Sequence, residues 1–280
     1  MQPLREHSDF CVVVPIYNHA ATLPKVVEDI QMHGYDVLVV NDGSTDATHD
    51  VLAQLIQKQH QERVQGLNLC QNQRSTGDSH LLVIEFHKNR GKGYALRKAM
   101  SRLNELGYRY AISIDADGQH FASDISLFTQ GVAYHPDALL IGARGMKHDN
   151  MPKKNTFANR FSNFWFALQT GRSLPDTQSG FRLYPIRKLA KMTFLTTRYE
   201  WELEVLVRAA WAGIPLVSKP ISVYYPRKEE RISHFRPGMD FLRISLLNTF
   251  LCLGALLYFY PVCCFRHLFC RRSSQSQITF

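Results

Sequence analysis

Two acidic residues one position apart follow a short apolar run in this chain. The run at 110–114 leads directly into Asp115 and Asp117, and Gln119 follows two positions later. Carboxylate and amide oxygens are hard ligands of the kind that Mg²⁺ and Mn²⁺ prefer, and Mg²⁺ is usually held by few protein groups together with water and phosphate oxygens. The spacing therefore predicts a site for Mg²⁺ or Mn²⁺ whose protein ligands are Asp115, Asp117 and Gln119.

Three other short apolar runs also end in polar residues, which suggests that all four runs are strands of one sheet. Runs that are apolar throughout are typical of strands buried on both faces. Because helical patterns alternate with them, we expect β-α-β units with right-handed crossovers and a parallel sheet. The carboxyl ends of parallel strands meet at one edge, where open α/β sheets bind their ligands. The runs and their polar ends are 11–15 with Asn18, 37–40 with Asn41 and Asp42, and 82–86 with His87, Asn89 and Arg90.

The segments around these runs predict further elements. Thr22 is placed to cap a helix that Gly34 ends, and Ser44 or Thr45 is placed to cap the next helix. A fifth strand is expected at 139–141 and a helix at about 200–212.

Two apolar helical patterns occupy the second half of the chain. Aromatic residues at 157–168 recur at helical spacing, and this face either packs on the core or lies at a lipid boundary. The segment 244–265 is almost wholly apolar, and its length is near the roughly 20 residues that span a bilayer. Basic residues flank it on both sides, so the sequence leaves its orientation open, and it does not decide between a span and an interfacial helix.

The composition is that of a globular protein with an anionic partner. The chain has 280 residues, of which 45% are hydrophobic and 20% charged, and its net charge is +9. This length suits one large α/β domain or one domain with an appendage. The positive charge fits phosphorylated small molecules and an anionic membrane surface. Nucleic acid is not an expected partner, because the sequence has no zinc-finger spacing, helix-turn-helix pattern or basic-aromatic stripe.

The cysteines and the N-terminus favour a cytosolic protein. The six cysteines show no metal-type spacing, so we expect reduced thiols. The N-terminal MQPLREHSDF contains no apolar signal core, so no cleaved export signal is expected.

Six short motifs stand in order along the chain: Val14-Pro15-Ile16-Tyr17-Asn18, Asn41-Asp42-Gly43-Ser44-Thr45-Asp46, Asn89-Arg90-Gly91-Lys92-Gly93, Asp115-Ala116-Asp117-Gly118-Gln119, Gly142-Ala143-Arg144 and Ser179-Gly180-Phe181-Arg182. In this order and spacing they resemble family 2 glycosyltransferases, and within that family the polyprenyl-phosphate (dolichyl-phosphate) mannose or glucose synthase branch. The resemblance covers about residues 9–235. It implies a GT-A fold, which is a single α/β domain with a Rossmann-like, mainly parallel sheet. A hydrophobic helix at 236–265 and a basic tail at 266–280 would follow that domain.

The resemblance also implies a nucleotide-diphosphate sugar donor, a divalent cation and inversion at the anomeric carbon. Asp115, Asp117 and Gln119 match the family's metal and diphosphate site, with Asp117 as the residue on which catalysis depends. A metal ion there would stabilise negative charge on the departing diphosphate. Other positions match the family's donor site. By this resemblance Asp42 would contact the base or ribose, and the base would stack at Pro15 and Tyr17. Lys92 lies where a cation would approach the donor, and Arg231 and Ser233 resemble a basic loop that closes over the phosphates.

One position departs from the family pattern. The family usually has Glu directly after the Tyr-Asn pair, whereas this chain has His19. The imidazole of His19, which is neutral or cationic, therefore replaces a carboxylate that would accept a hydrogen bond from the base or ribose of the sugar donor. This departure leaves the nucleotide open between UDP and GDP, with His19 retained as a donor-site position.

The acceptor decides which further residues the reaction needs. A lipid phosphate is already ionised, so arginines must hold it and no strong base is required; a guanidinium suits a phosphate through its bidentate geometry. A hydroxyl acceptor would need a base, for which Asp176 is the best candidate; otherwise Asp176 orients the loop around Ser179. The resemblance places four residues at the acceptor, namely Arg144, Arg160, Ser179 and Arg182.

The sequence thus predicts an inverting, metal-dependent glycosyltransferase at the cytosolic face of a membrane. It would move a hexose from a UDP- or GDP-sugar to a lipid-linked acceptor such as polyprenyl phosphate. One alternative is a hydroxyl acceptor on a lipid or glycan, and another is a non-catalytic protein that binds nucleotide sugars, against which the complete acidic motif argues. A dinucleotide oxidoreductase is disfavoured because no Gly-x-Gly-x-x-Gly follows the first strand.

Overall fold

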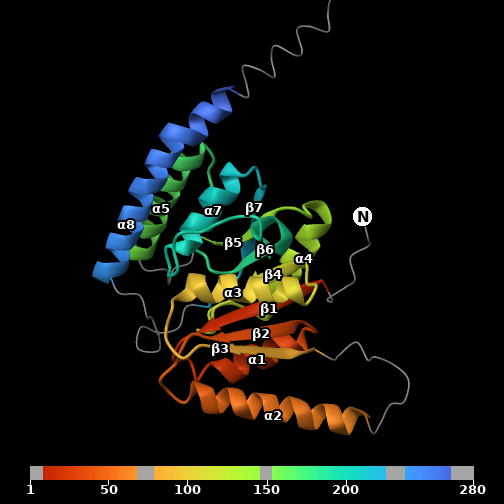
Figure 1. The fold of residues 1–280 in the computed structure, drawn as a ribbon. Coiled ribbons are helices and arrows are strands. Elements are labelled where there is room, and N and C mark those ends of the chain that lie inside the picture. The colour runs from red at the N-terminus through yellow and green to blue at the C-terminus, as the bar shows by residue number, and fades with distance from the viewer. Residues whose placement is uncertain (1–8, 68–78, 146–152, 225–236, 266–280) are drawn as a thin grey trace, which may run out of the picture.

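The computed structural model describes residues 9–67, 79–145, 153–224 and 237–265. Within these ranges the centre of the molecule is a seven-stranded sheet with the strand order β3-β2-β1-β4-β6-β5-β7 (Figure 1). Its first five strands in chain order are those that the apolar runs predicted. The strands are β1 (Phe10–Ile16), β2 (Asp36–Asn41), β3 (Leu81–Glu85), β4 (Tyr110–Ser113), β5 (Leu139–Arg144), β6 (Arg182–Pro185) and β7 (Leu216–Ile221).

The sheet is parallel except at β6. β1 pairs in parallel with β2 and β4, β2 with β3, and β5 with β7. β6 runs antiparallel between β4 and β5, and its first residue, Arg182, lies opposite Ser113 at the end of β4. The expected α/β fold with a mainly parallel sheet is therefore confirmed. The reversed direction of β6 also brings the segment before Arg182 to the edge where β4 ends.

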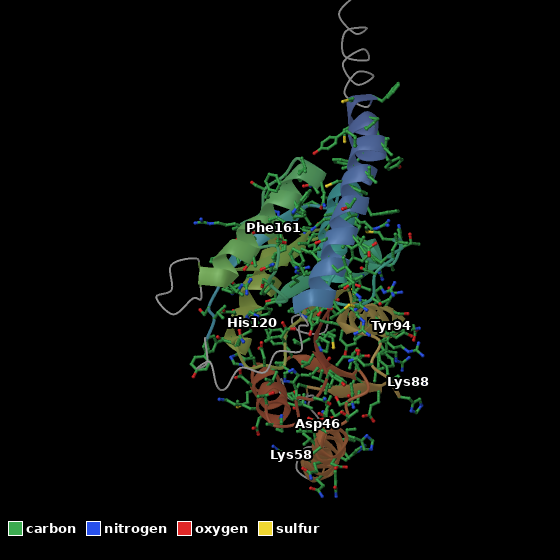
Figure 2. The ribbon with its side chains drawn as sticks, turned by 90° about the vertical axis from the view of Figure 1, so that its left-hand side faces the viewer. Asp46, Lys58, Lys88, Tyr94, His120 and Phe161 are labelled. Carbon is green, nitrogen blue, oxygen red and sulfur yellow. The ribbon has the colours of Figure 1, made fainter. Side chains whose placement is uncertain are left out.

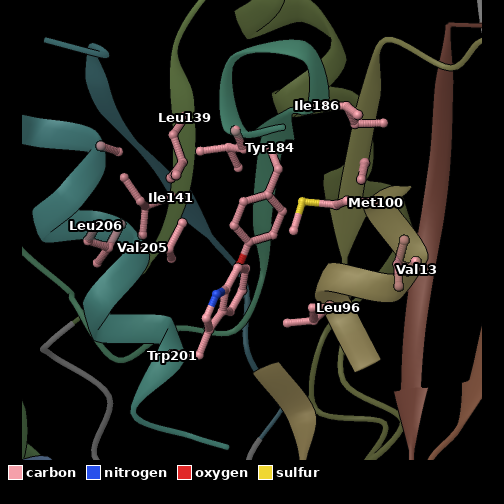
Figure 3. Packing of buried hydrophobic residues seen from close by; sticks show 14 of the residues in the cluster. Val13, Leu96, Met100, Leu139, Ile141, Tyr184, Ile186, Trp201, Val205 and Leu206 are labelled. Carbon is pink, nitrogen blue, oxygen red and sulfur yellow. The ribbon is translucent and has the colours of Figure 1, made fainter. Parts of the chain in front are cut away.

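Helices cover both faces of the sheet, and alternate strand residues supply the two cores. Val12 and Val37 face one core, and Val13 and Leu38 face the other. Figure 3 shows the second core, in which Tyr184 and other sheet residues lie among side chains of α3 and α7. The first core lies under α1 (Leu23–Met32), α2 (Thr48–Leu67) and α4 (Ile125–Tyr134), and the second lies under α3 (Lys92–Glu105), α6 (Ile186–Leu189) and α7 (Trp201–Trp211).

Thr22 occupies the N-cap position of α1, as predicted, but the expected side-chain capping bonds do not form, because the polar side chains have other partners. Thr22 makes no capping bond to α1; its hydroxyl donates to the carbonyl oxygen of Ala116. Asp46, rather than Ser44 or Thr45, accepts from the backbone N–H of Thr48 at the start of α2, at 3.1 Å. These hydroxyls instead bind loops at the carboxyl edge of the sheet.

The apolar C-terminal segment is a helix that lies beside α5 (Figure 1). α5 spans Lys153–Thr170, and α8 spans Pro237–Gly254 and continues through a π-helical turn at Ala255–Phe259 (η3). Among the described residues, one helix, Gly238–Phe265, is long and apolar enough to cross a membrane by length and composition. The boundary expected at 235 and the tail at 266–280 lie outside the described residues.

One side of each of these two helices is not buried in the protein. Leu247 and Leu251 of α8 are buried, whereas Phe161, Phe164 and Leu168 of α5 are between 40% and 60% exposed. For these three side chains, packing on the core is therefore wrong, and the interfacial alternative remains.

Candidate active site

The loops after β1 and β2 are hydrogen-bonded to each other. Asn18 has a φ of 57°, in the left-handed region that Asn adopts more readily than most residues. Its backbone N–H donates to Ser44 Oγ at 2.9 Å, and its Oδ1 accepts from the backbone N–H of Thr45 at 2.8 Å. These bonds fix the corner that carries the predicted donor positions Pro15, Tyr17 and His19.

The carboxylate of Asp42 binds the loop between β3 and α3. Its Oδ1 and Oδ2 accept from the backbone N–H groups of Arg90 and Gly91, each at 2.7 Å. Burial raises the pKa of Asp42 above its usual value, although these two bonds oppose the shift. Gly91 has a φ of 98°, and a Cβ there would lie 2.5 Å from Arg198 Cγ, so this loop requires glycine. Contact between Asp42 and a nucleotide stays a prediction.

Lys92 lies between two carboxylates at the carboxyl edge of the sheet. Its Nζ is 2.7 Å from Asp115 Oδ1, after β4, and 3.0 Å from Glu202 Oε1, in the first turn of α7. Sequence reasoning placed Lys92 at the donor; the structure places its ammonium against Asp115 and Glu202.

The charges in this cluster shift one another's pKa values. Burial alone would lower the pKa of Lys92, but Asp115 and Glu202 outweigh burial and raise that pKa well above its usual value. Burial alone would raise the pKa of Asp115, but Lys92 outweighs it and holds the pKa below its usual value. Burial and the Asp115 charge together raise the pKa of Asp117 to about 6. Asp117 is therefore the carboxylate that a bound cation would stabilise most.

The oxygen atoms at the acidic motif are ligands that suit a hard divalent cation. Asp117 Oδ1 accepts from the backbone N–H of Gln119 at 3.0 Å, so a tight turn holds these two residues close together. The described residues contain no group of three or more His, Cys, Asp and Glu side chains that could hold a metal. A cation here would therefore be held by the two carboxylates, the Gln119 amide and non-protein ligands, as is usual for Mg²⁺. The metal-ligand roles of Asp115, Asp117 and Gln119 stay predictions.

Arg144 and Asp176 form a bidentate ion pair. Arg144 Nε donates to Asp176 Oδ2 at 2.7 Å, and Nη2 donates to Oδ1 at 3.0 Å. Asp176 is 1% exposed and also accepts from the backbone N–H groups of Gln178 and Ser179, each at 3.1 Å. A bidentate pair fixes both the position and the plane of the guanidinium. Asp176 therefore orients Arg144 and the loop that contains Ser179.

The other predicted acceptor residues do not gather around Arg144. Arg182 is fully buried, and its guanidinium donates to the carbonyl oxygens of Ser179 at 2.7 Å and Thr177 at 2.8 Å. The structure thus corrects the acceptor role of Arg182, because these bonds hold the loop before β6. Ser179 is itself buried, and Arg160 lies exposed on α5. Arg231 and Ser233 lie outside the described residues.

Comparison with known proteins identifies the family. The model of glycosyl transferase family 2 matches residues 11–192. The chain belongs to glycosyl transferase family 2. It is therefore a glycosyltransferase, and its sheet order and helices are those of the expected GT-A fold.

Two curated relatives of this glycosyltransferase are named for dolichyl phosphate. The UDP-N-acetylglucosamine–dolichyl-phosphate N-acetylglucosaminyltransferase of Methanococcus voltae is 27% identical over 220 residues, which are 76% of this chain and 85% of the relative. The dolichyl-phosphate beta-glucosyltransferase of Drosophila melanogaster is 27% identical over 231 residues, which are 74% of this chain and 64% of the relative. Both names agree with the polyprenyl-phosphate branch that the motifs indicate.

A solved structure shares the fold of this glycosyltransferase. It is the mannosyltransferase PcManGT of Pyrobaculum calidifontis in complex with GDP-Man and Mn²⁺. The two chains superimpose with a TM-score of 0.50 and 14% identity, over 89% of this chain and 73% of the other. At this identity the likeness shows the fold alone.

Two residues of the glycosyltransferase site were missed by sequence reasoning. Glu202 is one of three alternating glutamates at the start of α7, but the sequence does not reveal that it pairs with Lys92. His120 has its ring 5.2 Å from the Phe181 ring, and among the described residues its buried Nδ1 has no hydrogen-bond partner. Burial lowers the pKa of His120 to about 4, so the ring is neutral at neutral pH.

Gly180→Ala is expected to lower kcat/KM of the glycosyltransferase about 10–100-fold, because displacing an active-site group by about 1 Å has effects of this size. A Cβ at this position would lie 2.6 Å from Asp115 Oδ2 and 2.8 Å from Lys92 Nζ, so the ion pair must move. Steady-state kinetics with a thermal unfolding curve measure the effect. Gly238→Ala is the control, because its Cβ would enter open space. Wild-type kinetics in folded Gly180→Ala would show that the placement of Asp115 is unimportant.

Proposed function

We propose that this glycosyltransferase moves a hexose, with inversion, from a UDP- or GDP-sugar to a polyprenyl phosphate at the cytosolic face of a membrane. The bidentate Arg144–Asp176 pair carries the proposal, because it fixes a guanidinium at the end of β5. β6 is antiparallel to both β4 and β5, so β5 ends at the same edge of the sheet as β4, which the acidic motif follows. The loop that Asp176 holds also reaches the acidic motif, because a Cβ at Gly180 would lie 2.6 Å from Asp115 Oδ2, and the neighbouring Ser179 donates its backbone N–H to Asp176 Oδ1. The dolichyl-phosphate names of the two relatives also support a lipid phosphate.

In the proposed reaction an oxygen of the acceptor phosphate attacks the anomeric carbon of the donor sugar. The bond from this carbon to the diphosphate breaks, and the nucleoside diphosphate leaves with the electron pair. No proton has to be removed from the acceptor, because a phosphate is ionised at neutral pH. Mg²⁺ or Mn²⁺, held by Asp115, Asp117 and Gln119, would supply charge for the departing diphosphate.

The chain's own residues position the two substrates in this scheme. Arg144 binds the acceptor phosphate, and Asp176 holds the guanidinium in the required plane. Lys92 fixes the Asp115 carboxylate, and Asp42 fixes the loop at Arg90 against the end of β2. Pro15, Tyr17 and His19 form the corner for the nucleotide base.

The surroundings of Asp176 favour a phosphate acceptor over a hydroxyl. A general base must be within hydrogen-bond reach of the proton that it removes. Asp176 is 1% exposed, and both of its oxygens already accept from Arg144 and from the backbone. These contacts suit an orienting carboxylate, so the hydroxyl acceptor becomes the second candidate.

A matched pair of acceptors tests the proposal. The full chain, purified with lipid, is assayed with UDP- and GDP-sugars and Mn²⁺ against a polyprenyl phosphate and the corresponding free polyprenol. We expect release of nucleoside diphosphate and a glycosylated lipid with the phosphate alone. Transfer to the polyprenol would establish the hydroxyl alternative, and sugar-nucleotide binding without any transfer would establish the non-catalytic one.

Arg144→Ala is expected to raise the KM for polyprenyl phosphate at least ~10-fold, which corresponds to a loss of about 1.4 kcal/mol of binding. The Kd of the nucleoside diphosphate with Mn²⁺, followed by titration calorimetry, should stay within about twofold, because Arg144 is assigned to the acceptor. Arg187→Ala, on the exposed side of α6, is the control for the loss of one positive charge. A weaker nucleotide affinity with an unchanged acceptor KM would move Arg144 to the donor site.

A further inference from the structure

Large apolar side chains are exposed on two neighbouring helices, α5 and α8. The two helices lie side by side in both views of the molecule, and Figure 2 labels Phe161 on α5. Soluble proteins rarely expose large contiguous apolar patches without a partner. We call this patch the α5–α8 surface and define it by six side chains that are between 40% and 75% exposed, namely Phe161, Phe164 and Leu168 of α5 and Phe250, Leu253 and Leu257 of α8.

We propose that the α5–α8 surface lies flat in the interface of an anionic bilayer, so that α8 attaches the enzyme to the membrane without crossing it. The lipid partner rests on the proposed function, in which the acceptor is a membrane lipid. The proposal adds the orientation of the apolar helix and the participation of α5, which the sequence left open.

Contacts along the length of α8 hold it on the folded domain. Gln169 Nε2 of α5 donates to Asn248 Oδ1 at 3.1 Å and to the Asn248 carbonyl oxygen at 3.2 Å. Twelve residues further along the helix, the Tyr260 hydroxyl donates to the carbonyl oxygen of Leu168 at 2.7 Å. Between these bonds the ring of Trp211 stacks on Phe259, with centroids 5.8 Å apart. The helix is therefore docked on α5 and α7 over most of its apolar length.

These contacts are incompatible with a helix that crosses the bilayer alone. A spanning helix needs about 20 residues within the hydrocarbon. A span that included 240–260 would have to break the contacts with α5 and α7 or carry polar groups of the domain, such as Gln169, into lipid, which is costly. An interfacial helix needs only one apolar face, buried about 5–10 Å below the headgroups. The exposed sides of α5 and α8 supply such a face while the docked sides stay on the protein.

The charge around the surface fits anionic headgroups. α5 contains no acidic residue, and the acidic residue of α8, Asp240, is 4% exposed and lies 3.7 Å from Arg243. Arg160 on α5 and Arg172 just after it are exposed. The whole chain carries a net charge of +9. Basic residues close to an anionic membrane strengthen binding.

Flotation with vesicles tests the surface without donor or acceptor. The full chain is mixed with vesicles of phosphatidylglycerol and phosphatidylcholine, and with vesicles of phosphatidylcholine alone. We expect tighter binding to the anionic vesicles. Phe164→Glu and Leu257→Glu should each lower the partition coefficient at least ~10-fold, because each removes a large apolar side chain that the lipid would bury. Tyr134→Glu on α4, where the side chain is 80% exposed, is the matched control and should bind like the wild type.

The variant in α5, Phe164→Glu, distinguishes an α8 that lies in the interface from an α8 that spans the bilayer. If α8 crossed the membrane alone, α5 would remain in water, and Phe164→Glu would float like the wild type; that result would overturn the proposal. A wild-type dimer by light scattering in the absence of vesicles, dissociated by both variants, would assign the surface to a second copy and would also overturn it.

Donor binding and transfer in solution keep this proposal separate from the proposed function. Titration of UDP or GDP with Mn²⁺ checks that each variant has an intact donor site. Vesicle binding without any sugar transfer would support the membrane role of the α5–α8 surface and count against the proposed transfer reaction. Transfer to a short-chain, water-soluble polyprenyl phosphate without vesicle binding would support the proposed transfer reaction and overturn the membrane role of the α5–α8 surface.

Discussion

Asp117→Ala is expected to lower kcat at least ~100-fold while the protein remains folded. Asp117 follows β4 beside Asp115, and burial with the Asp115 charge raises the pKa of Asp117 to about 6. Removing this carboxylate relieves a local repulsion, so the fold should not suffer. In the proposed reaction it also removes a charged ligand of the cation that would offset charge on the departing diphosphate, and the loss of one such electrostatic element typically costs about 10²–10³ in kcat.

Transfer rates with Mn²⁺ and the thermal unfolding midpoint measure this variant. The control is Asp137→Ala, which removes an exposed surface carboxylate paired with Lys188 and should turn over like the wild type. Calorimetry should also show that Mn²⁺ no longer strengthens nucleotide binding to Asp117→Ala. Turnover close to the wild type in a folded Asp117→Ala protein would contradict the assignment of the acidic motif.

Asp176→Asn is expected to raise the acceptor KM at least ~10-fold, with kcat at saturating acceptor within about threefold of the wild type. The amide no longer neutralises Arg144, so the guanidinium loses its fixed plane. The free energy of unfolding should fall by about 3 kcal/mol, as is typical when one partner of a buried ion pair is removed. Urea unfolding and acceptor-dependent kinetics over a range of pH give these quantities.

A double variant shows whether Asp176 acts through Arg144. If it does, Arg144→Ala with Asp176→Asn should raise the acceptor KM no further than Arg144→Ala alone. A drop in kcat of ~10²–10⁴, with donor affinity preserved, is the result expected for a missing general base. That drop would establish the hydroxyl acceptor and reject the phosphate.

The strands were predictable where apolar runs were long enough to mark them. β1 to β5 are continuous apolar runs, and their alternate residues face two cores, as the runs implied. β6 is only four residues long and begins with a buried arginine, Arg182, so its sequence does not resemble a buried strand. β7 includes Lys219 and Pro220 and is mostly half-buried, which hides it in the same way.

The positions of the site residues were more predictable than their partners. The acidic motif lies at the end of β4, as expected, because strand ends fix its place. Lys92 points to Glu202, a residue 110 positions later, and no local pattern encodes this pairing. Arg182 was expected at the acceptor, but the antiparallel β6 turns its guanidinium to the carbonyl oxygens of its own loop. Thr22 stands at the N-cap of α1 but makes no capping bond for the same reason, since its hydroxyl donates to the carbonyl oxygen of Ala116 from a distant segment.

The ion pairs of Lys92 also lead us to expect that a metal ion and a nucleoside diphosphate help each other to bind. With Asp117 ionised, three carboxylates and one ammonium leave two negative charges in the cluster, which repel a nucleoside diphosphate that arrives alone. One divalent cation cancels this charge, and the diphosphate then meets a neutral site. We therefore expect metal and nucleotide to bind with positive cooperativity, in which thermodynamic linkage requires each to strengthen the binding of the other by the same factor. By neutralising one carboxylate, Lys92 would match the net charge of the cluster to a single divalent cation.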